Sequence, residues 1–238
     1  MDEVVLSHVI DRLKNVTVRT SPFPHFYIEN IFPDDYYQEL IAHLPETSSY
    51  VNLGQLGKTD PRIYQQRLVL PLQEDELCRL PFGHLLFWSQ FAAALKSQTW
   101  CEMLVEKFQP YIQERFGEHY DRVTFSSTAE LVRDSSNYAI GPHTDHPIRV
   151  LTLLFYFPAT EEQAHLGTSV YEPHDANFEC EGFVHHPFEG FRKVYTALFL
   201  PNSVFGFVRS NRSFHGVEPI QTQVERNLLN TYLQWNHK

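Results

Sequence analysis

The sequence predicts an α+β protein whose core is mainly β, with supporting helices in its first half. Apolar residues recur at helical spacing over 84–117, a pattern typical of amphipathic helices. After residue 120 the chain changes to short β-branched and aromatic runs bounded by turn residues, which is typical of a β-sandwich or barrel. We therefore expect one domain over 1–238, with helices and an N-terminal strand in 1–120 and the β core in 121–238.

The elements of the first half follow from local patterns. Residues 23–32 alternate well enough for a strand, and residues 34–44 read as a helix that starts on two acidic side chains and stops before Pro45. Acidic residues in a first turn are stabilised by the helix dipole. Polar residues with scattered Gly and Pro over 50–73 indicate a loop that contains one short strand at 65–70.

The remaining elements are two helices, a series of strands and one long loop. The helices lie within 84–117, and the second is interrupted at Pro110 and ended by Gly117. Residues 160–193 are polar and aromatic, and we expect a loop and candidate lid there, because loops on a rigid scaffold often carry specificity. We expect the histidines of this loop, His185 among them, to be solvated. The predicted strands of the second half are 122–132, 150–157, 196–201, 203–208 and 229–235.

Charge and composition exclude several classes of protein. The 238 residues carry 19 Lys and Arg against 29 Asp and Glu, a net charge of −10, so the chain has no overall attraction for nucleic acid. No signal peptide and no membrane-spanning apolar stretch is visible. The three cysteines form no CxxC pair, which favours a reducing compartment. We expect a cytoplasmic protein without a membrane or nucleic-acid partner, and the 14% of aromatic residues leaves room for a homo-oligomer.

A His-x-Asp motif is the strongest chemical signal. His143 and Asp145 are two residues apart, so on an extended chain both side chains point to the same side. His215, far downstream beside the predicted strand 203–208, offers a third ligand. Two histidines and one carboxylate bind one face of a metal ion and leave the other positions open, as is typical of non-haem iron(II) oxygenases. His146 follows Asp145 directly, so strand alternation directs it away from the metal.

Arg226 adds a candidate carboxylate clamp to this motif. It follows His215 at the start of the last predicted strand, so one turn and an antiparallel strand would return it to the metal. Its rigid guanidinium fork suits bidentate binding of a carboxylate. Asn230 shares the face of Arg226 by the two-residue period of a strand and is a candidate cavity residue.

In this order, the His-x-Asp motif, the distant histidine and the basic residue after it resemble the iron(II)/2-oxoglutarate-dependent oxygenase superfamily. The stretch SPFPHFYIENIFP at 21–33, followed by a predicted helix, is similar to the opening strand of its prolyl-4-hydroxylase-like branch. The resemblance covers about residues 21–236. It implies a double-stranded β-helix, or jelly-roll, core with N-terminal supporting helices.

The resemblance also implies a role for each matched residue. His143, Asp145 and His215 would hold iron(II). Arg226 would bind the distal carboxylate of 2-oxoglutarate, whose other end would chelate the metal beside O2. The implied reaction is hydroxylation of an unactivated C–H bond, with succinate and CO2 as co-products. An acidic ligand at Asp145 speaks against halogenation, whereas desaturation stays open.

Further candidates surround the motif. The phenol of Tyr138, five residues before His143, would be able to reach the cosubstrate carboxylate. Arg133 lies in the strand-like run ELVRD at 130–134, its direction is left open by the sequence, and it becomes a cosubstrate or substrate anchor if it points inward. A packing role is an equal alternative for Tyr138, Arg133 and Asn230. Arg149 and Thr152, at the next predicted strand, are candidate wall residues.

The substrate and two other functions stay open from the sequence. A small molecule, a sugar or glycan, and a residue of a peptide all suit the expected chemistry. A cupin-like mononuclear metal dioxygenase would use the metal without 2-oxoglutarate and would have no need of Arg226. A non-catalytic carbohydrate-binding jelly roll would use neither.

Overall fold

Two antiparallel sheets form the core of the described chain, one of seven strands and one of four. The computed structural model describes residues 1–57, 65–221 and 223–237. The helices are α1 (Glu3–Asn15), α2 (Asp34–Ala42), α3 (Glu74–Leu77), α4 (Phe82–Leu95), α5 (Gln98–Lys107) and α6 (Gln109–Phe116), with 3₁₀ turns η1 (Thr47–Ser49), η2 (Gly117–Arg122), η3 (Glu161–Leu166) and η4 (Phe188–Gly190). The strands are β1 (His25–Glu29), β2 (Val51–Asn52), β3 (Arg67–Pro71), β4 (Val123–Asp134), β5 (Ile140–His143), β6 (Arg149–Phe157), β7 (Ser169–Pro173), β8 (Phe191–Thr196), β9 (Ser203–Val208), β10 (His215–Val217) and β11 (Arg226–His237).

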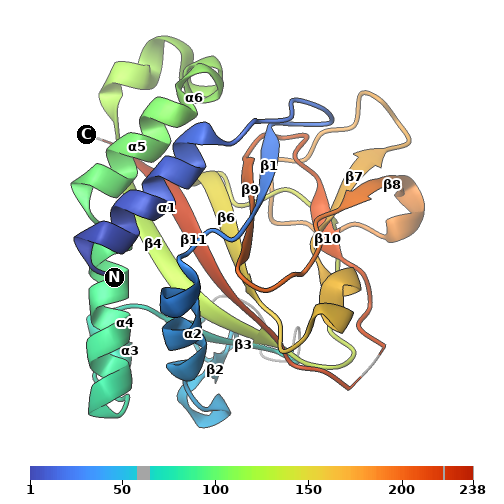
Figure 1. The fold of residues 1–238 in the computed structure, drawn as a ribbon. Coiled ribbons are helices and arrows are strands. Elements are labelled where there is room, and N and C mark those ends of the chain that lie inside the picture. Colours follow the sequence, from blue (N-terminus) through green and yellow to red (C-terminus); the bar gives the residue numbers. More distant parts are fainter. Residues whose placement is uncertain (58–64, 222, 238) are drawn as a thin grey trace.

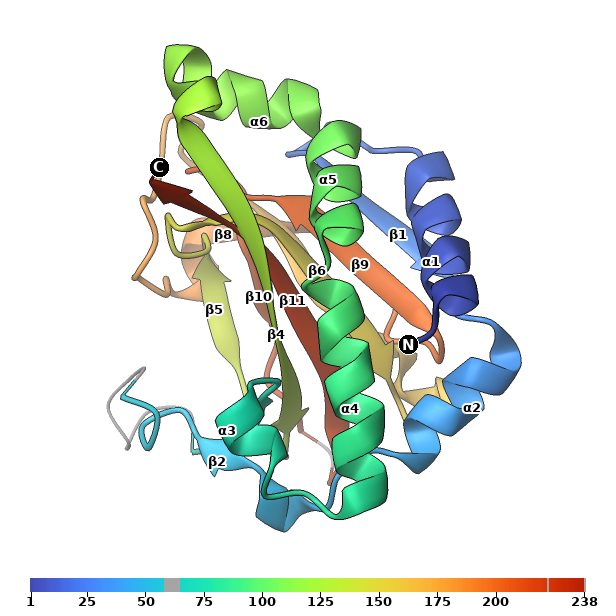
Figure 2. The same cartoon turned by 90° about the vertical axis from the view of Figure 1, so that its left-hand side faces the viewer.

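The larger sheet is covered on both faces. Helices α1, α4 and α5 lie against its outer face, and the smaller sheet lies on the opposite side (Figures 1 and 2). On the helical side, Trp88 and Trp100 pack with Phe155 and Leu229 of the sheet. Between the sheets, Leu228 packs with apolar residues of β7 and β9. Burial on both faces explains why the strand β6 is an almost continuous apolar run.

The alternation along β11 directs polar side chains toward the smaller sheet. The larger sheet has the order β1-β9-β6-β11-β4-β3-β2, so β11 lies between β6 and β4. Leu229 and Leu233 enter the helix-side core, whereas Leu228 enters the core between the sheets. Arg226 and Asn230 have the parity of Leu228, so their side chains face the inner cavity.

The smaller sheet brings the two halves of the predicted metal motif together. Its order is β5-β10-β7-β8. Strands β5 and β10 pair antiparallel, with His215 directly opposite His143. Strand β10 also pairs with β7, so His215 lies on an inner strand of this sheet, whereas His143 lies on its edge strand β5.

The α+β, mainly β prediction is confirmed, and most predicted strands and helices are present. The predicted strand 203–208 has the bounds of β9, and 122–132, 150–157 and 229–235 lie within or almost within β4, β6 and β11. In the described part of the first half, β1 and β3 correspond to the strands predicted at 23–32 and 65–70, and β2 is an additional strand; all three join the larger sheet. The part of the expected loop at 58–64 lies outside the described residues.

Three predicted elements differ from the structure. Residues 197–200 are not a strand, although Ala197 and Phe199 are fully buried. Their amides donate instead to the carbonyls of Thr168 and Ala164, so this run is apolar because it is a buried connection. The second predicted helix is interrupted as expected, but the boundary between α5 and α6 lies at Phe108 rather than at Pro110.

The segment 160–193 is the third difference, because it is not one loop. It contains η3, β7 and the start of β8, and β7 is held by pairing with β10 and β8. The polar and aromatic composition of this segment predicted a loop, although it includes β7 and the start of β8, which form one side of the smaller sheet. In the described residues, no helix has the length and apolarity required to cross a bilayer.

Candidate metal and cosubstrate site

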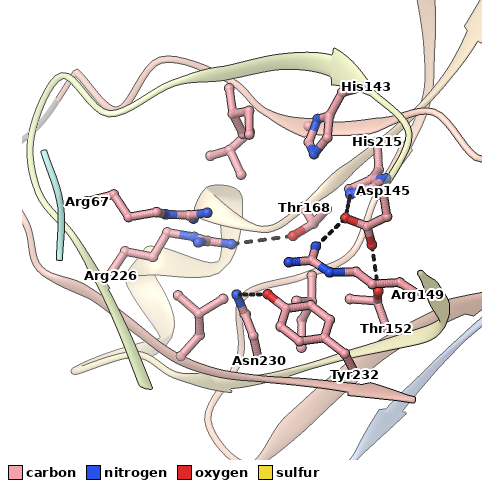
Figure 3. Close-up of a pocket in the computed structure, with 15 residues that line it drawn as sticks. Arg67, His143, Asp145, Arg149, Thr152, Thr168, His215, Arg226, Asn230 and Tyr232 are labelled. Atoms are coloured by element: carbon pink, nitrogen blue, oxygen red, sulfur yellow. Dashed lines mark hydrogen bonds and ion pairs between the residues drawn. The ribbon is translucent and has the colours of Figure 1, made fainter. Parts of the chain in front are cut away.

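Three side chains converge at the junction of β5 and β10 (Figure 3). One donor atom from each of His143, Asp145 and His215 lies within 4.8 Å of the other two. Nδ1 of each histidine is bonded to a backbone carbonyl two residues earlier, His143 to Gly141 and His215 to Ser213, both at 3.0 Å. These bonds fix each ring with Nδ1 protonated, so that the Nε2 lone pair faces the group.

The protonation states of the three side chains suit metal binding. Burial, with His215 nearby, lowers the pKa of His143 to about 3. Burial also lowers the pKa of His215. Burial raises the pKa of the Asp145 carboxyl, but Arg149 and the two histidines lower it by more, so it lies below its usual range. Neutral imidazoles and an ionised carboxylate are the forms that bind a divalent metal.

The Asp145 carboxylate is held from both sides. Arg149 donates from Nη1 to Oδ1 at 2.5 Å, and Thr152 donates from Oγ1 to Oδ2 at 2.6 Å. Both donors lie on β6, as the sequence suggested for cavity walls. The guanidinium of Arg149 also lies over the ring of Tyr232, 3.6 Å from its centroid. Asp145 is therefore oriented before any metal binds.

The turn that carries Asp145 is fixed by arginines that the sequence gave no reason to select. Arg209 donates to the backbone carbonyl of Asp145 at 3.1 Å. Arg115 of α6 donates to the carbonyls of Pro147 and Arg149. Trp235 of β11 donates to the same Pro147 carbonyl at 2.8 Å. Helix, strand and turn thus meet at one backbone segment.

Arg226 lies in a small cavity of about 60 Å³ that begins at the triad. Its side chain is 1% exposed. It donates from Nε to Leu166 O at 2.7 Å, from Nη1 to Asp134 Oδ2 at 2.8 Å and from Nη2 to Thr168 Oγ1 at 3.4 Å. The predicted residue is therefore at the cavity, but part of its fork is already bonded to the protein.

Asn230 and Tyr232 also line this cavity, as their parity predicts. The Asn230 amide donates from Nδ2 to the Tyr232 hydroxyl at 2.9 Å, and that hydroxyl is 3.2 Å from Glu130 Oε1. Asn230 is 5% exposed, and its Oδ1 is buried with no hydrogen-bond partner among the described residues. A buried amide with an unused polar atom indicates a ligand or water position.

Arg133 is placed elsewhere, and its expected anchoring role has no geometric basis. It lines neither cavity at the triad among the described residues. It donates to Asn227 Oδ1 at 2.8 Å and to Pro45 O at 3.2 Å, and its guanidinium lies 4.8 Å from the Tyr50 ring centroid. Its neighbour Asp134 occupies the inward position, because successive strand residues point to opposite faces.

A larger cavity of about 670 Å³ also opens on His143 and Asp145. Tyr138, which is 1% exposed, lies on its wall. The mouth includes Phe183, 73% exposed, whose ring lies 4.6 Å from that of His146. His146 is not part of the three-residue metal group, as expected.

His185 differs from the expectation of a merely solvated loop histidine. It is exposed, but it lines the larger cavity and its ring centroid is 4.6 Å from that of His143. Its segment is held close to the triad, because the amide of His186 donates to Pro142 O at 2.9 Å. Gly182 has φ +107°, and a Cβ there would lie 2.8 Å from Asp145 O, so only glycine permits this approach.

Arg67 is a further cavity residue that the sequence did not single out, and it lines both cavities. It begins β3, which corresponds to the short strand predicted at 65–70. The sequence pattern predicted the strand on which Arg67 lies. It did not predict that this strand pairs with β4, which places Arg67 opposite Asp134.

Comparisons with known proteins show which solved structures have a similar fold. No protein-family model and no curated protein matches the sequence. A prolyl 4-hydroxylase from Phytophthora capsici is similar in structure, with a TM-score of 0.53 and 16% identity over 96% of this chain and 65% of that chain. A prolyl hydroxylase from Trichoplax adhaerens, in complex with a hypoxia inducible factor peptide fragment, has a TM-score of 0.50 and 13% identity over 98% and 90%.

A third similar structure is an α-ketoglutarate-dependent carbocyclase, SnoK from nogalamycin biosynthesis. Its TM-score is 0.52, with 9% identity over 100% of this chain and 87% of that chain. The chain therefore has the jelly-roll fold of 2-oxoglutarate oxygenases, with two sheets that do not close into a barrel. The resemblance to the prolyl-4-hydroxylase-like branch is confirmed at the level of the fold.

Proposed function

We propose that the protein is an iron(II)- and 2-oxoglutarate-dependent oxygenase that hydroxylates an unactivated C–H bond. The observation that carries the proposal is the convergence of His143, Asp145 and His215, whose donor atoms lie within 4.8 Å of one another. Two imidazoles and one carboxylate fit iron(II) in a site that keeps positions open. When bound, iron(II) and 2-oxoglutarate supply the activation of O2 and the oxidation of the C–H bond, with succinate and CO2 as co-products.

The residues of this chain would bind and orient the metal and 2-oxoglutarate. The two Nε2 atoms and Asp145 would hold the metal, and Thr152 and Arg149 keep the carboxylate in one orientation. Arg226 would bind the distal carboxylate of 2-oxoglutarate in the small cavity. These side chains are fixed before any ligand arrives, so little reorganisation is required.

Asn230 would bind the same cosubstrate by a flip of its amide. In the structure its buried Oδ1 has no partner among the described residues, and Nδ2 donates to Tyr232. With a carboxylate in the cavity, the opposite orientation is favoured, because Nδ2 then donates to the ligand. Oδ1 then accepts from the Tyr232 hydroxyl, whose single proton turns from Glu130 to Asn230. Tyr138 lies on the wall of the larger cavity, where its ring would hold the guanidinium of Arg67 in place rather than bind the cosubstrate.

The larger cavity would receive the substrate. Its volume of about 670 Å³ suits a small molecule, a sugar unit or the side chain of a peptide. The Trichoplax prolyl hydroxylase is in complex with a peptide, which supports a peptide as one of these classes. Residues 182–186 lie against the triad and would contribute to the recognition of the substrate.

An anaerobic titration tests the proposal without a known substrate. The protein is titrated with iron(II) and then with 2-oxoglutarate, and the weak visible charge-transfer band of the chelate is recorded. We expect the band with the wild-type protein, no band with Asp145→Ala, and with Arg226→Ala a band that requires more 2-oxoglutarate, because the clamp is lost. Iron binding without a band would favour a metal dioxygenase that does not use 2-oxoglutarate. Absence of iron binding would favour a carbohydrate-binding jelly roll.

A further inference from the structure

Two arginines share one buried carboxylate on three neighbouring strands. Arg67 of β3 and Arg226 of β11 are both paired in register with Asp134 of β4. Arg67 donates from Nε to Oδ1 at 2.6 Å and from Nη2 to Oδ2 at 2.8 Å. Arg226 donates from Nη1 to the same Oδ2 at 2.8 Å. The two guanidinium groups lie side by side and point toward the triad (Figure 3).

This row carries an unbalanced positive charge inside the protein. Asp134 is 0% exposed, and the side chains of Arg226 and Arg67 are 1% and 16% exposed. One carboxylate neutralises only one of the two guanidinium groups. A buried net charge is costly unless a counter-charge is present. The cavity therefore favours an anionic ligand at this end.

The hydrogen bonds of the two arginines show how many N–H groups each has left to bind a ligand carboxylate. A guanidinium has five N–H groups. Arg226 directs three of them to Leu166, Asp134 and Thr168, so two are left for a ligand. Arg67 directs two of its five to Asp134, so three are left, and no other hydrogen bond involves it among the described residues.

The orientation of Arg67 is fixed by packing as well as by its ion pair. Its guanidinium lies 4.3 Å from the centroid of the Tyr138 ring. A guanidinium stacked on an aromatic ring and bonded to a carboxylate has few rotamers open to it. Arg67 also lines both the small and the larger cavity, so it lies where the cosubstrate and substrate spaces meet.

We propose that Arg67 is a second cosubstrate-binding residue, which with Arg226 forms a two-arginine clamp selecting 2-oxo acids that carry a distal carboxylate. This inference rests on the proposed function. Asp134 binds both guanidinium groups and leaves one net positive charge for the ligand. The clamp recognises the carboxylate, and the metal recognises the 2-oxo acid end.

The test compares two probes on the manganese(II)-loaded protein, which binds ligands without turnover. Calorimetry gives the dissociation constants of 2-oxoglutarate and of 2-oxobutyrate, which lacks the distal carboxylate. With Arg67→Gln we expect the constant for 2-oxoglutarate to rise by about tenfold or more, because a charge-assisted contact is lost. The constant for 2-oxobutyrate should change by less than about twofold. Arg79→Gln, at an exposed arginine whose ion pair is with Glu76, is the matched control.

The outcomes separate this inference from the proposed function. Equal 2-oxoglutarate affinity in wild type and Arg67→Gln would overturn the role of Arg67 and leave the proposed function intact. Failure of the wild-type protein to bind 2-oxoglutarate would overturn both. Equal losses for both probes would also overturn the clamp, since they indicate a distorted site. Arg67→Lys retains the charge without the fork and should give an intermediate constant, which provides a second reading if Arg67→Gln folds poorly.

Discussion

Arg226 and Asp134 lie opposite each other on β11 and β4, and their side chains are joined at 2.8 Å with 1% and 0% exposure. Arg226 lines the cavity that begins at the metal-binding group, and Asp134 holds its guanidinium group. Because Asp134 also holds Arg67, this one carboxylate orients both candidate cosubstrate arginines. We therefore expect Asp134 to affect both the stability of the fold and the binding of the cosubstrate.

Asp134→Asn should destabilise the fold strongly. The variant keeps the shape of the side chain but leaves Arg226 and Arg67 without their shared counter-charge. Breaking a buried ion pair by removing one partner costs about 3–5 kcal/mol. We expect a fall of this size in the free energy of unfolding, measured by urea denaturation. Glu76→Gln, at the pair with the exposed Arg79, should cost less than about 1 kcal/mol. Similar costs for both variants would contradict the buried pairing.

Removal of a triad residue should remove metal binding without unfolding the protein. His215→Ala and Asp145→Ala each delete one of the three donors that lie within 4.8 Å of one another. We expect no measurable binding of manganese(II) or iron(II) in equilibrium dialysis, with an unchanged circular dichroism spectrum. His146→Ala is the matched control for metal affinity, because His146 is exposed and adjacent to Asp145 but outside the group. Retained metal binding in Asp145→Ala would show that the site lies elsewhere.

Arg115 should support metal affinity from a distance. It donates to the carbonyls of Pro147 and Arg149, in the turn after Asp145. Burial, with Arg209 nearby, lowers the pKa of Arg115 to about 10, so it remains cationic at neutral pH. Outer partners of metal ligands contribute about 10–100-fold in affinity. We expect Arg115→Gln to weaken manganese(II) binding by about tenfold.

The control for this prediction is Arg122→Gln, at an exposed residue that ends η2, the turn directly after α6. A loss of thermal stability alone, with unchanged metal affinity, would assign Arg115 to folding and not to the orientation of Asp145. Arg115→Lys should recover part of the affinity, since a single ammonium can donate to one of the two carbonyls.

His25 should make stability depend on pH. Burial is the largest cause that lowers its pKa below the usual value of 6.5, and its Nδ1 bond to Phe23 O opposes the shift. As the pH falls below about 6.5, the unfolded chain takes up a proton that the folded chain does not. The unfolded state then binds more protons, so the free energy of unfolding falls from about pH 7 toward the lower folded-state pKa.

Urea denaturation at several pH values between about 7.5 and 5.5 tests this sign. His25→Phe keeps an aromatic ring in the same surroundings but cannot titrate, so its stability should depend less on pH than that of the wild type. The other buried histidines contribute equally to both proteins. Parallel curves for wild type and variant would contradict a lowered pKa at His25.

Local patterns in the sequence predicted which side chains lie together at the site. The spacing of His143 and Asp145, and the order of His215 and Arg226 after them, indicated a metal group with a carboxylate clamp. The two-residue period correctly placed Arg226 and Asn230 on one face of β11. Such features depend on a few adjacent residues, and the sequence contains them directly.

The two-residue period of a strand did not predict the direction of the Arg133 side chain. The sequence left its direction open, and the structure turns it away from both cavities toward Asn227 and Pro45. Likewise, Ala197 and Phe199 have strand-like composition because they are buried, although their backbone forms a connection. Apolar character reports burial, and burial is shared by strands and by enclosed connections.

The sequence by itself determined the donor set, the mainly β core with N-terminal helices, and the parity of side chains along each strand. Only the tertiary structure decided which strands are neighbours. The pairing of β3 with β4 places Arg67 beside Asp134, and the packing of α6 places Arg115 against the turn that follows Asp145. Both contacts join residues far apart in the chain, and they depend on the free energy of burying whole faces, which no local spacing encodes.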